Sequence, residues 1–295
     1  MSRSQAMFLL VIAAVFFGGI FPVNRLAAEA GWPAMGFTLI PAVAAGIVLL
    51  ALNTMLVGRL PVSPRALLAD VVIGGLVIGL PVGILVHVAD HLPASTVTLV
   101  LCLSPILTLV IATLAGSEKF DLRVLLGMLL GTGGIILIVS PESGILGAGD
   151  AYWFLLALLT PVMFALANNC AVWLRPPASA AVSMAAGTLL GGAAVAAVVA
   201  LIVSPHIWPA QMTAAQVIPA TLSTLINVVF FWLFFKLVAA IGPARFSFFN
   251  YLAVAAGILW SMLVFREIPA PVFWLAAALM LTGMHFALRP KAGRA

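Results

Sequence analysis

The chain has 295 residues, of which 64% are hydrophobic and only 7% charged, and its formal net charge is +5. Soluble domains carry about 25% charged residues, so this composition excludes a soluble fold. A membrane span needs about 20 mostly apolar residues, and the chain is long enough for about ten such spans joined by short loops. We therefore predict an all-α integral membrane protein whose surroundings are membrane lipid, with no nucleic-acid partner.

Ten apolar runs follow one another along the chain, separated by charged residues or helix breakers. We expect membrane-spanning helices at residues 5–24, 34–57, 67–88, 93–115, 123–140, 151–174, 178–203, 215–238, 243–265 and 270–288. The first run is too long for a typical signal-peptide core and further runs follow it directly, so we interpret it as the first span. The runs do not alternate between polar and apolar residues, which disfavours the strands of a membrane barrel.

The basic residues divide unequally between the two sides of these spans. If the N-terminus is cytoplasmic, eleven of them fall on the cytoplasmic side: Arg3, Arg59, Arg65, Lys119, Arg123, Arg175, Lys236, Arg245, Arg289, Lys291 and Arg294. Only Arg25 and Arg266 fall outside. Because Lys and Arg are enriched in cytoplasmic loops, this bias predicts an inner-membrane protein with both termini in the cytoplasm.

The sequence shows no sign of a cofactor or a metal. Cys102 and Cys170 lie inside apolar runs, so we interpret them as buried thiols outside any disulfide. There is no zinc motif of the HExxH type and no nucleotide-binding loop. We therefore expect no cofactor and no ATP-driven pumping by this chain alone.

The two halves of the chain resemble each other weakly. The segment 92–95 (Leu-Pro-Ala-Ser) recurs as 242–245 (Gly-Pro-Ala-Arg), with an offset of 150. Three later matches have an offset of 149, namely Glu118 with Glu267, Gly134 with Gly283, and Pro141 with Pro290. Their shared order along the span pattern indicates an internal repeat.

Each half, residues 1–145 and 146–295, is expected to hold five spans. Five is odd, so the second half must insert upside down relative to the first. Inverted repeats are a known architecture of secondary transporters, because one scaffold then gives two states that open to opposite sides. The alternative interpretation is a duplicated membrane anchor without a transport role.

Four stretches resemble motifs of the drug/metabolite transporter superfamily, and the chain resembles a member with two EamA-type repeats. These stretches are Phe17-Gly18-Gly19 through Arg25; Leu92 through Pro105; Gly116 through Lys119; and Ile241 through Leu252 with Arg266-Glu267. The resemblance implies ten helices in two inverted five-helix repeats. It also implies export of amino acids, metabolites or drugs through a cavity lined by helices 1, 3, 4, 6, 8 and 9.

The chain departs from the family pattern where a binding site would be expected. Phe17 replaces a usual Trp, Ile20 replaces a usual Asn, and Pro41 stands near a usual Arg. The pair Ala253-Val254 stands where the second copy often has Glu-Pro. The scaffold therefore transfers to this chain better than the substrate does.

Polar residues inside spans are costly, so they usually face a cavity or a partner helix. In the span 243–265, a stripe of small or polar residues lies on one helical face: Ser247, Asn250, Val254, Gly257 and Ser261. This stripe fits either tight helix packing or a wet cavity, and the amide of Asn250 favours the cavity because it has four hydrogen-bonding sites to satisfy.

Further candidate contacts for a solute lie on the other expected core helices. Ser223 and Asn227 are one turn apart, and Asn168 and Asn169 are adjacent; these amides either bind a polar solute or join helices. Lys236 either extends to the cytoplasmic surface or meets an anion in the cavity. The candidate substrate-binding residues are Asn168, Asn169, Asn227, Asn250, Trp232, Lys236, His87 and Thr98.

His87 and Asp90 lie three residues apart near the outer end of the span 67–88. A histidine beside a carboxylate takes up protons near neutral pH, which would suit proton coupling. The alternative is a pair at the end of a helix in the headgroup region.

The sequence as a whole predicts a monomeric secondary transporter, not an enzyme, that exports amino acids or related small solutes by alternating access. An integral-membrane enzyme and a passive channel are the alternatives. An enzyme needs a catalytic cluster at one depth, and no convincing one is present in the sequence.

Overall fold

The computed structural model describes residues 3–58, 63–88, 91–92, 97, 100–139, 151–176, 179–203, 206–266 and 271–288. The described residues form helices and no strand. The helices are α1 (Arg3–Gly18), α2 (Ile20–Glu29), α3 (Ala34–Leu56), α4 (Pro64–Gly74), the π-helix η1 (Gly75–Gly79), α5 (Leu80–Val88), α7 (Ser104–Leu114), α8 (Leu122–Val139), α9 (Ala151–Trp173), α10 (Ala181–Val203), α11 (Ala214–Ile241), α12 (Pro243–Phe246), α13 (Phe249–Phe265) and α14 (Val272–Leu288).

Within these residues, seven helical stretches are long and apolar enough to cross a membrane. They are Gln5–Glu29, Ala34–Leu56, Pro64–Val88, Tyr152–Trp173, Ala181–Val203, Ala214–Ile241 and Pro243–Phe265. Three shorter apolar helices, Ser104–Leu114, Leu122–Ile136 and Val272–Phe286, lie where the sequence predicts the remaining spans. The all-helical, multi-pass membrane class is confirmed.

The first helical stretch is longer than predicted and is interrupted at Gly19. The predicted span ended at residue 24, whereas α2 continues to Glu29. Arg25 is tolerated inside this helix because Glu29 accepts from its Nε at 3.0 Å, and because its guanidinium lies 4.0 Å from the ring centroid of Phe265. The positive charge of Arg25, which predicted the end of the span, is therefore paired with Glu29 one helical turn later.

Two further boundaries follow local chemistry that the span pattern did not reveal. The span predicted to begin at residue 67 begins at Pro64, because the Ser63 side chain accepts from the backbone N–H of Ala66 and caps the helix. The predicted span 243–265 is divided into α12 and α13, and the hydroxyl of Ser247 at the division donates to the carbonyl of Ala244 at 2.7 Å.

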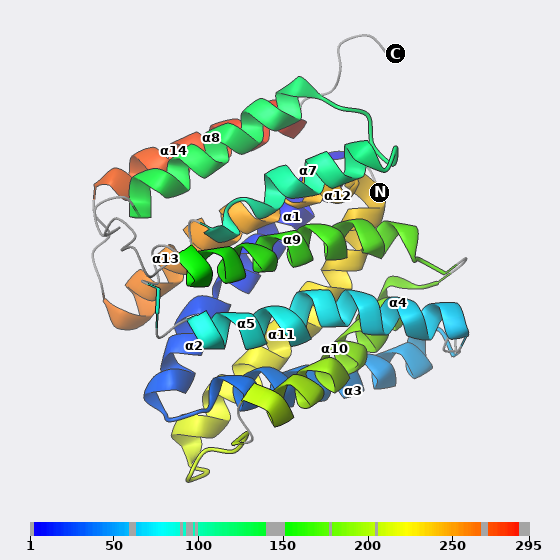
Figure 1. Ribbon diagram of the computed structural model, residues 1–295, viewed down its shortest axis with the longest axis vertical. Helices are drawn as coiled ribbons and strands as arrows, with labels where there is room; N and C mark the ends of the chain where they lie inside the picture. Colours follow the sequence, from blue (N-terminus) through cyan, green and yellow to red (C-terminus); the bar gives the residue numbers. More distant parts are fainter. Residues whose placement is uncertain are drawn as a thin grey trace.

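Figure 1 shows the long helices lying side by side in one bundle, with successive helices running in opposite directions. α1 begins at the end of the bundle on the right of the view, where α3 ends and α4 begins. α2 ends and α3 begins at the opposite end. α14 ends on the side where α1 begins, so the described parts of the first and last helices share one end of the bundle.

Close helix contacts recur with the offset of the sequence repeat. A Cβ atom added to Gly134 of α8 would lie 2.8 Å from the carbonyl oxygen of Ala276 in α14, and one added to Gly283 of α14 would meet the carbonyl oxygen of Gly127 in α8. Adding 149 to the numbers of Gly127 and Gly134 gives those of Ala276 and Gly283. The two contacts are therefore exchanged by this offset in residue number.

A second pair of contacts behaves in the same way. Gly18 of α1 packs directly on Gly257 of α13. An offset of 149 or 150 converts these positions into Thr108 of α7 and Asn168 of α9, whose side chains are joined by a hydrogen bond of 3.3 Å. The residue numbers of these two contacts therefore correspond under nearly the same offset.

Candidate functional site

Two neighbouring pockets lie in the middle of the bundle, with volumes of about 180 Å³ and about 170 Å³. The first is lined by Phe17, Ile20, Asn24, Phe37, Thr38, Ala42, Val77, Ile78, Val82, Ser223, Asn227, Phe230 and Phe231. The second is lined by Phe17, Val77, Phe164, Asn168, Phe230, Phe231, Phe234, Phe246, Phe249 and Asn250. Each pocket therefore takes its walls from both halves of the chain.

A wall of large side chains is common to the two pockets. Phe17, Val77, Phe230 and Phe231 line both of them. The ring centroids of Phe17 and Phe230 are 4.3 Å apart, a contact distance for aromatic rings. These side chains divide the central space into two compartments.

The first pocket carries several uncharged polar groups. Ser223 and Asn227 lie one turn apart on α11, and the Nδ2 atom of Asn227 is 3.5 Å from the hydroxyl of Ser223. Asn24 and Thr38 face them from α2 and α3. This compartment can therefore donate and accept hydrogen bonds without contributing a formal charge.

The second pocket combines two amides with aromatic rings. Asn168, which is almost fully buried, donates from Nδ2 to the Oγ1 atom of Thr108 at 3.3 Å, and Asn250 is half-buried. Among the described residues that line the two pockets, none is charged. The site fits a small solute that has both a polar part and an apolar part.

Asn169, the neighbour of Asn168, points away from both pockets and joins two helices. It is fully buried, and its Nδ2 donates to the carbonyl oxygens of Thr108 at 3.2 Å and Ala165 at 2.9 Å. Adjacent residues on a helix point about 100° apart, so only one of these two amides reaches the pocket.

Trp232 and Lys236 lie on the outer face of α11, and neither lines a central pocket. The Nζ atom of Lys236 lies 4.0 Å from the centroid of the Trp232 ring, a cation–π contact. Asn227 lies on the other side of this helix, as the nine-residue separation from Lys236 predicts. A role of this pair in solute binding stays a prediction.

His87 lies apart from the central pockets, in a third pocket of about 500 Å³ shared with Tyr152 and apolar residues of α5, α9 and α10. The ring centroid of His87 is 5.3 Å from that of Trp153, on which His91 stacks at 3.5 Å. The predicted partner Asp90 and the candidate Thr98 lie outside the described residues.

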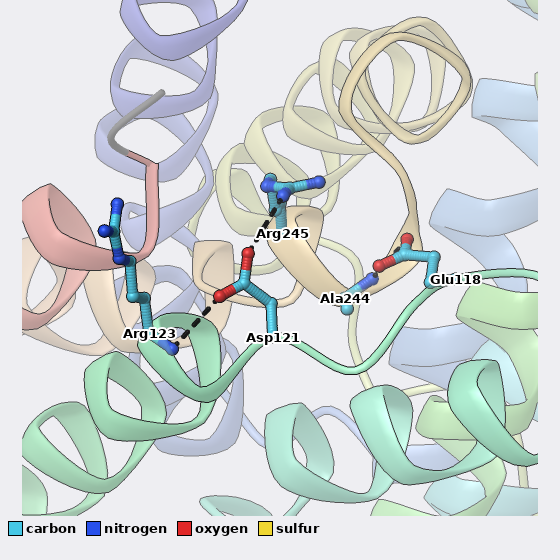
Figure 2. Close-up of polar contacts among 5 residues, drawn as sticks. All are labelled: Glu118, Asp121, Arg123, Ala244 and Arg245. Atoms are coloured by element: carbon cyan, nitrogen blue, oxygen red, sulfur yellow. Dashed lines mark hydrogen bonds and ion pairs between the residues drawn. The ribbon is translucent and has the colours of Figure 1, made fainter. Parts of the chain in front are cut away.

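A set of polar contacts joins the two halves at one end of the bundle (Figure 2). Glu118, after α7, accepts a hydrogen bond at its Oε1 from the backbone N–H of Ala244 in α12, at 3.4 Å. Asp121 lies 3.9 Å from the guanidinium of Arg245 and also accepts from the backbone N–H of Arg123 at 3.1 Å. We call these contacts the inter-half clamp.

Burial raises the pKa of the Glu118 carboxyl above its usual value, while the N–H of Ala244 and the charge of Arg245 act in the opposite direction. The backbone at Gly242 also packs tightly against the carboxylate of Glu118. Gly242 has a φ of 83°, and a side chain there would meet the carboxylate of Glu118.

Sequence reasoning missed part of the pocket wall and the partners of Glu118. Asn24 lies seven residues after Phe17, a spacing that places both on one helical face and would have indicated Asn24. The contact of Glu118 with Ala244 had no such signal, because the two residues are 126 positions apart in the chain.

The comparisons with known proteins agree with this architecture. Residues 4–140 match the EamA-like transporter family. This match confirms the resemblance to the drug/metabolite transporter superfamily. No curated protein sequence matches the chain.

Solved structures extend the likeness to the rest of the chain. One crystal structure, titled only as that of a protein, is 18% identical in sequence and has a TM-score of 0.78. The match covers 97% of this chain and 99% of the other. At this identity the likeness shows the fold alone, and that fold extends well beyond residue 140.

Proposed function

We propose that this protein is a secondary transporter that moves small solutes across the membrane by alternating access through the two central pockets. The observation that carries the proposal is the pair of pockets between the halves, lined by uncharged amides and aromatic rings. The match to a transporter family gives independent support. The residues 1–145 and 146–295 would be the two repeats that move against each other.

The proposed substrates are amino acids or related metabolites, and the proposed direction is export. Drug-binding pockets usually measure about 300–1,000 Å³, whereas each compartment here holds less than 200 Å³. The size therefore favours an amino acid over a larger drug. Amides would bind the polar groups of such a solute, and phenylalanine rings would contact its side chain.

The proposed topology has ten spans in two inverted repeats, with both termini in the cytoplasm. The exchanged contacts between α8 and α14, and between the pairs α1–α13 and α9–α7, support a twofold relation between the halves. The shared position of the beginning of α1 and the end of α14 supports an even number of spans (Figure 1). One chain supplies both pockets, which is consistent with a monomer.

The proposal is tested by counterflow in liposomes that contain the purified protein. The liposomes are loaded with an excess of one unlabelled amino acid, and the same amino acid is supplied outside in labelled form. The assay is repeated for each of the proteinogenic amino acids. We expect transient accumulation of at least one label, because a carrier exchanges solutes one at a time whereas a channel does not accumulate them.

Matched variants assign the exchange to the pockets. Asn250→Ala and Asn227→Ala should reduce the initial rate at least about tenfold, the effect of losing one buried polar contact of about 1.4 kcal/mol. Leu225→Ala, at an exposed position of α11 outside both pockets, should retain the rate. Absence of counterflow across the whole panel, with folded protein, would refute the proposed function.

A further inference from the structure

Asp70 is the one acidic residue of the span Pro64–Val88, and it belongs to neither central pocket. It lies in α4, half-buried, in a separate pocket of about 250 Å³ between α3, α4 and α10. The carboxylate packs directly on Gly187, and the backbone of Asp70 packs on Gly191. Two glycines of α10 therefore provide the space that the acidic side chain occupies.

No cation or hydrogen-bond donor of the described residues contacts this carboxylate. The described parts of α3 and α10 hold no ionisable side chain, and α9 holds only Tyr152 and Cys170. The span of Asp70 itself carries Arg65 near its beginning and His87 near its end. None of these groups forms an ion pair with Asp70.

Arg65 of α4 and Arg175, which follows α9, form hydrogen bonds to other groups. Arg65 donates from Nη2 to the carbonyl oxygen of Trp173 at 3.4 Å, and Arg175 donates from Nη2 to the carbonyl oxygen of Ser179 at 3.1 Å. An ionised carboxyl group inside a span is costly, and no partner among the described residues offsets that cost here.

A hydroxyl group, that of Ser183, lines the same pocket as Asp70. Ser183 of α10 lines the pocket, and its hydroxyl donates to the Oδ1 atom of the fully buried Asn53. The proton of this hydroxyl is therefore engaged with Asn53 and does not stabilise a negative charge on Asp70. The chemistry of the pocket therefore favours a bound proton over a negative charge.

A continuous helix links Asp70 to the central pockets. α4 passes directly into the π-helix η1, a feature that often occurs at functional sites. Val77 of η1 lines both central pockets and lies roughly 10 Å along the helix from Asp70. Between them, Gly74 packs against the backbone of Gly192, so this helix and α10 lie in close backbone contact.

We propose that Asp70 is a proton-binding site, and that gain and loss of its proton shifts α4 and η1 along α10 and so reshapes the central pockets. The step is a simple protonation: a proton from water adds to a carboxylate oxygen, and it returns to water when the site opens. The link to solute movement rests on the proposed transport function, whereas proton binding itself does not.

The test of proton binding uses the purified protein in phosphatidylcholine liposomes, whose headgroups carry no titrating amine or carboxyl group. Infrared difference spectra between alkaline and acidic buffer report the carbonyl stretch of protonated carboxyl groups. We expect Asp70→Asn to remove one band, and the control Glu29→Gln, an exposed residue outside every pocket, to retain it. Unchanged bands in Asp70→Asn would overturn the proposal.

A second variant keeps the test decisive if Asp70→Asn does not fold. Gly187→Ala leaves the carboxyl group in place but adds a methyl group where that carboxylate packs. We expect the same band to shift its titration in Gly187→Ala and not in Glu29→Gln. A titration identical to that of the wild type would contradict the assignment.

Coupling is tested by spin labels on the exposed positions Leu68 of α4 and Val198 of α10. We expect their distance to change with pH in the wild-type background and to stay constant in Asp70→Asn. A pH-dependent distance that persists in Asp70→Asn would overturn the coupling.

The two proposals can fail separately. A titrating Asp70 band without counterflow of any solute would remove the transport function and leave the proton site. Counterflow with the same pH dependence in wild type and Asp70→Asn would remove the coupling and leave the transporter.

Discussion

The adjacent amides Asn168 and Asn169 on α9 have different surroundings. Asn168 lines a pocket, and Asn169 is fully buried against the backbone of α7. The sequence places two polar residues at this depth, but periodicity alone leaves open which of them faces the cavity. Their different contacts imply opposite effects of substitution.

We predict that Asn169→Ala lowers the free energy of unfolding by about 1 kcal/mol and leaves solute affinity unchanged, because it removes hydrogen bonds between helices. Asn168→Ala should instead weaken solute binding and change stability less. Denaturation in detergent and ligand-dependent thermal shift measure the two quantities. Equal effects of both variants on affinity would contradict this assignment.

Glu118 gives the inter-half clamp a defined pH dependence. Burial raises the pKa of its carboxyl, so the folded protein binds this proton more tightly than the unfolded chain does. The stabilisation linked to this proton is therefore present at acidic pH and is lost as the pH rises through the folded pKa.

We predict that Glu118→Gln, which cannot titrate, loses less stability than the wild type over that pH rise. Thermal unfolding at a series of pH values measures the difference, with Glu29→Gln as the control that keeps the wild-type slope. Identical slopes in wild type and Glu118→Gln would show that Glu118 does not contribute to the pH dependence.

At the scale of the helices, neighbouring glycines on α8 provide a matched pair. A Cβ atom at Gly134 would lie 2.8 Å from the carbonyl oxygen of Ala276, whereas one at Gly133 would meet nothing within 4 Å. Helix propensity alone favours alanine over glycine by about 1 kcal/mol. For an alanine at Gly133, helix propensity is the main effect and is stabilising. For an alanine at Gly134, the close contact with α14 opposes that gain.

We predict that Gly133→Ala raises the melting temperature, and that Gly134→Ala lowers it because α14 must move away. Gly283→Ala should behave like Gly134→Ala, since it lies at the corresponding position of the repeat. Circular dichroism during heating measures all three variants. A stabilised Gly134→Ala would argue against tight packing of α8 on α14.

The helices were largely predictable because apolar runs of sufficient length determine where a chain crosses lipid. The boundaries of the helices were less predictable. Arg25 suggested an end of the first span, but its pairing with Glu29 lets the helix continue. The break between α12 and α13 lies at Ser247, whose hydroxyl donates to the carbonyl of Ala244, a local hydrogen bond that hydropathy does not encode.

The candidate site was predictable only in part. Asn227, Asn250 and Asn168 lie at the central pockets, because polar residues on core helices tend to face a cavity. Trp232 and Lys236 share α11 with Asn227 but lie on its outer face. The orientation of a uniformly apolar helix depends on its neighbours, so the sequence did not distinguish these two faces.

At the scale of the whole molecule, the clamp and the pockets describe one arrangement of the two halves. The clamp joins the connection between α7 and α8 to α12 at the end of the bundle where α1 begins (Figures 1 and 2). The pocket with Asn24 and Thr38 lies toward the opposite end, because Asn24 is in α2 and Thr38 is at the start of α3. Alternating access requires a second arrangement in which the clamp opens.

The most direct measurement of that requirement is the accessibility of one pocket residue from both faces of the membrane. In a protein with Cys102→Ala and Cys170→Ala, Ser223→Cys introduces a thiol of similar size in the first pocket, and Leu225→Cys places a control on the exposed face of α11. A membrane-impermeant maleimide is then added to either side. We predict that Ser223→Cys reacts from both faces and Leu225→Cys from neither; labelling of Ser223→Cys from one face only, in every condition, would contradict alternating access.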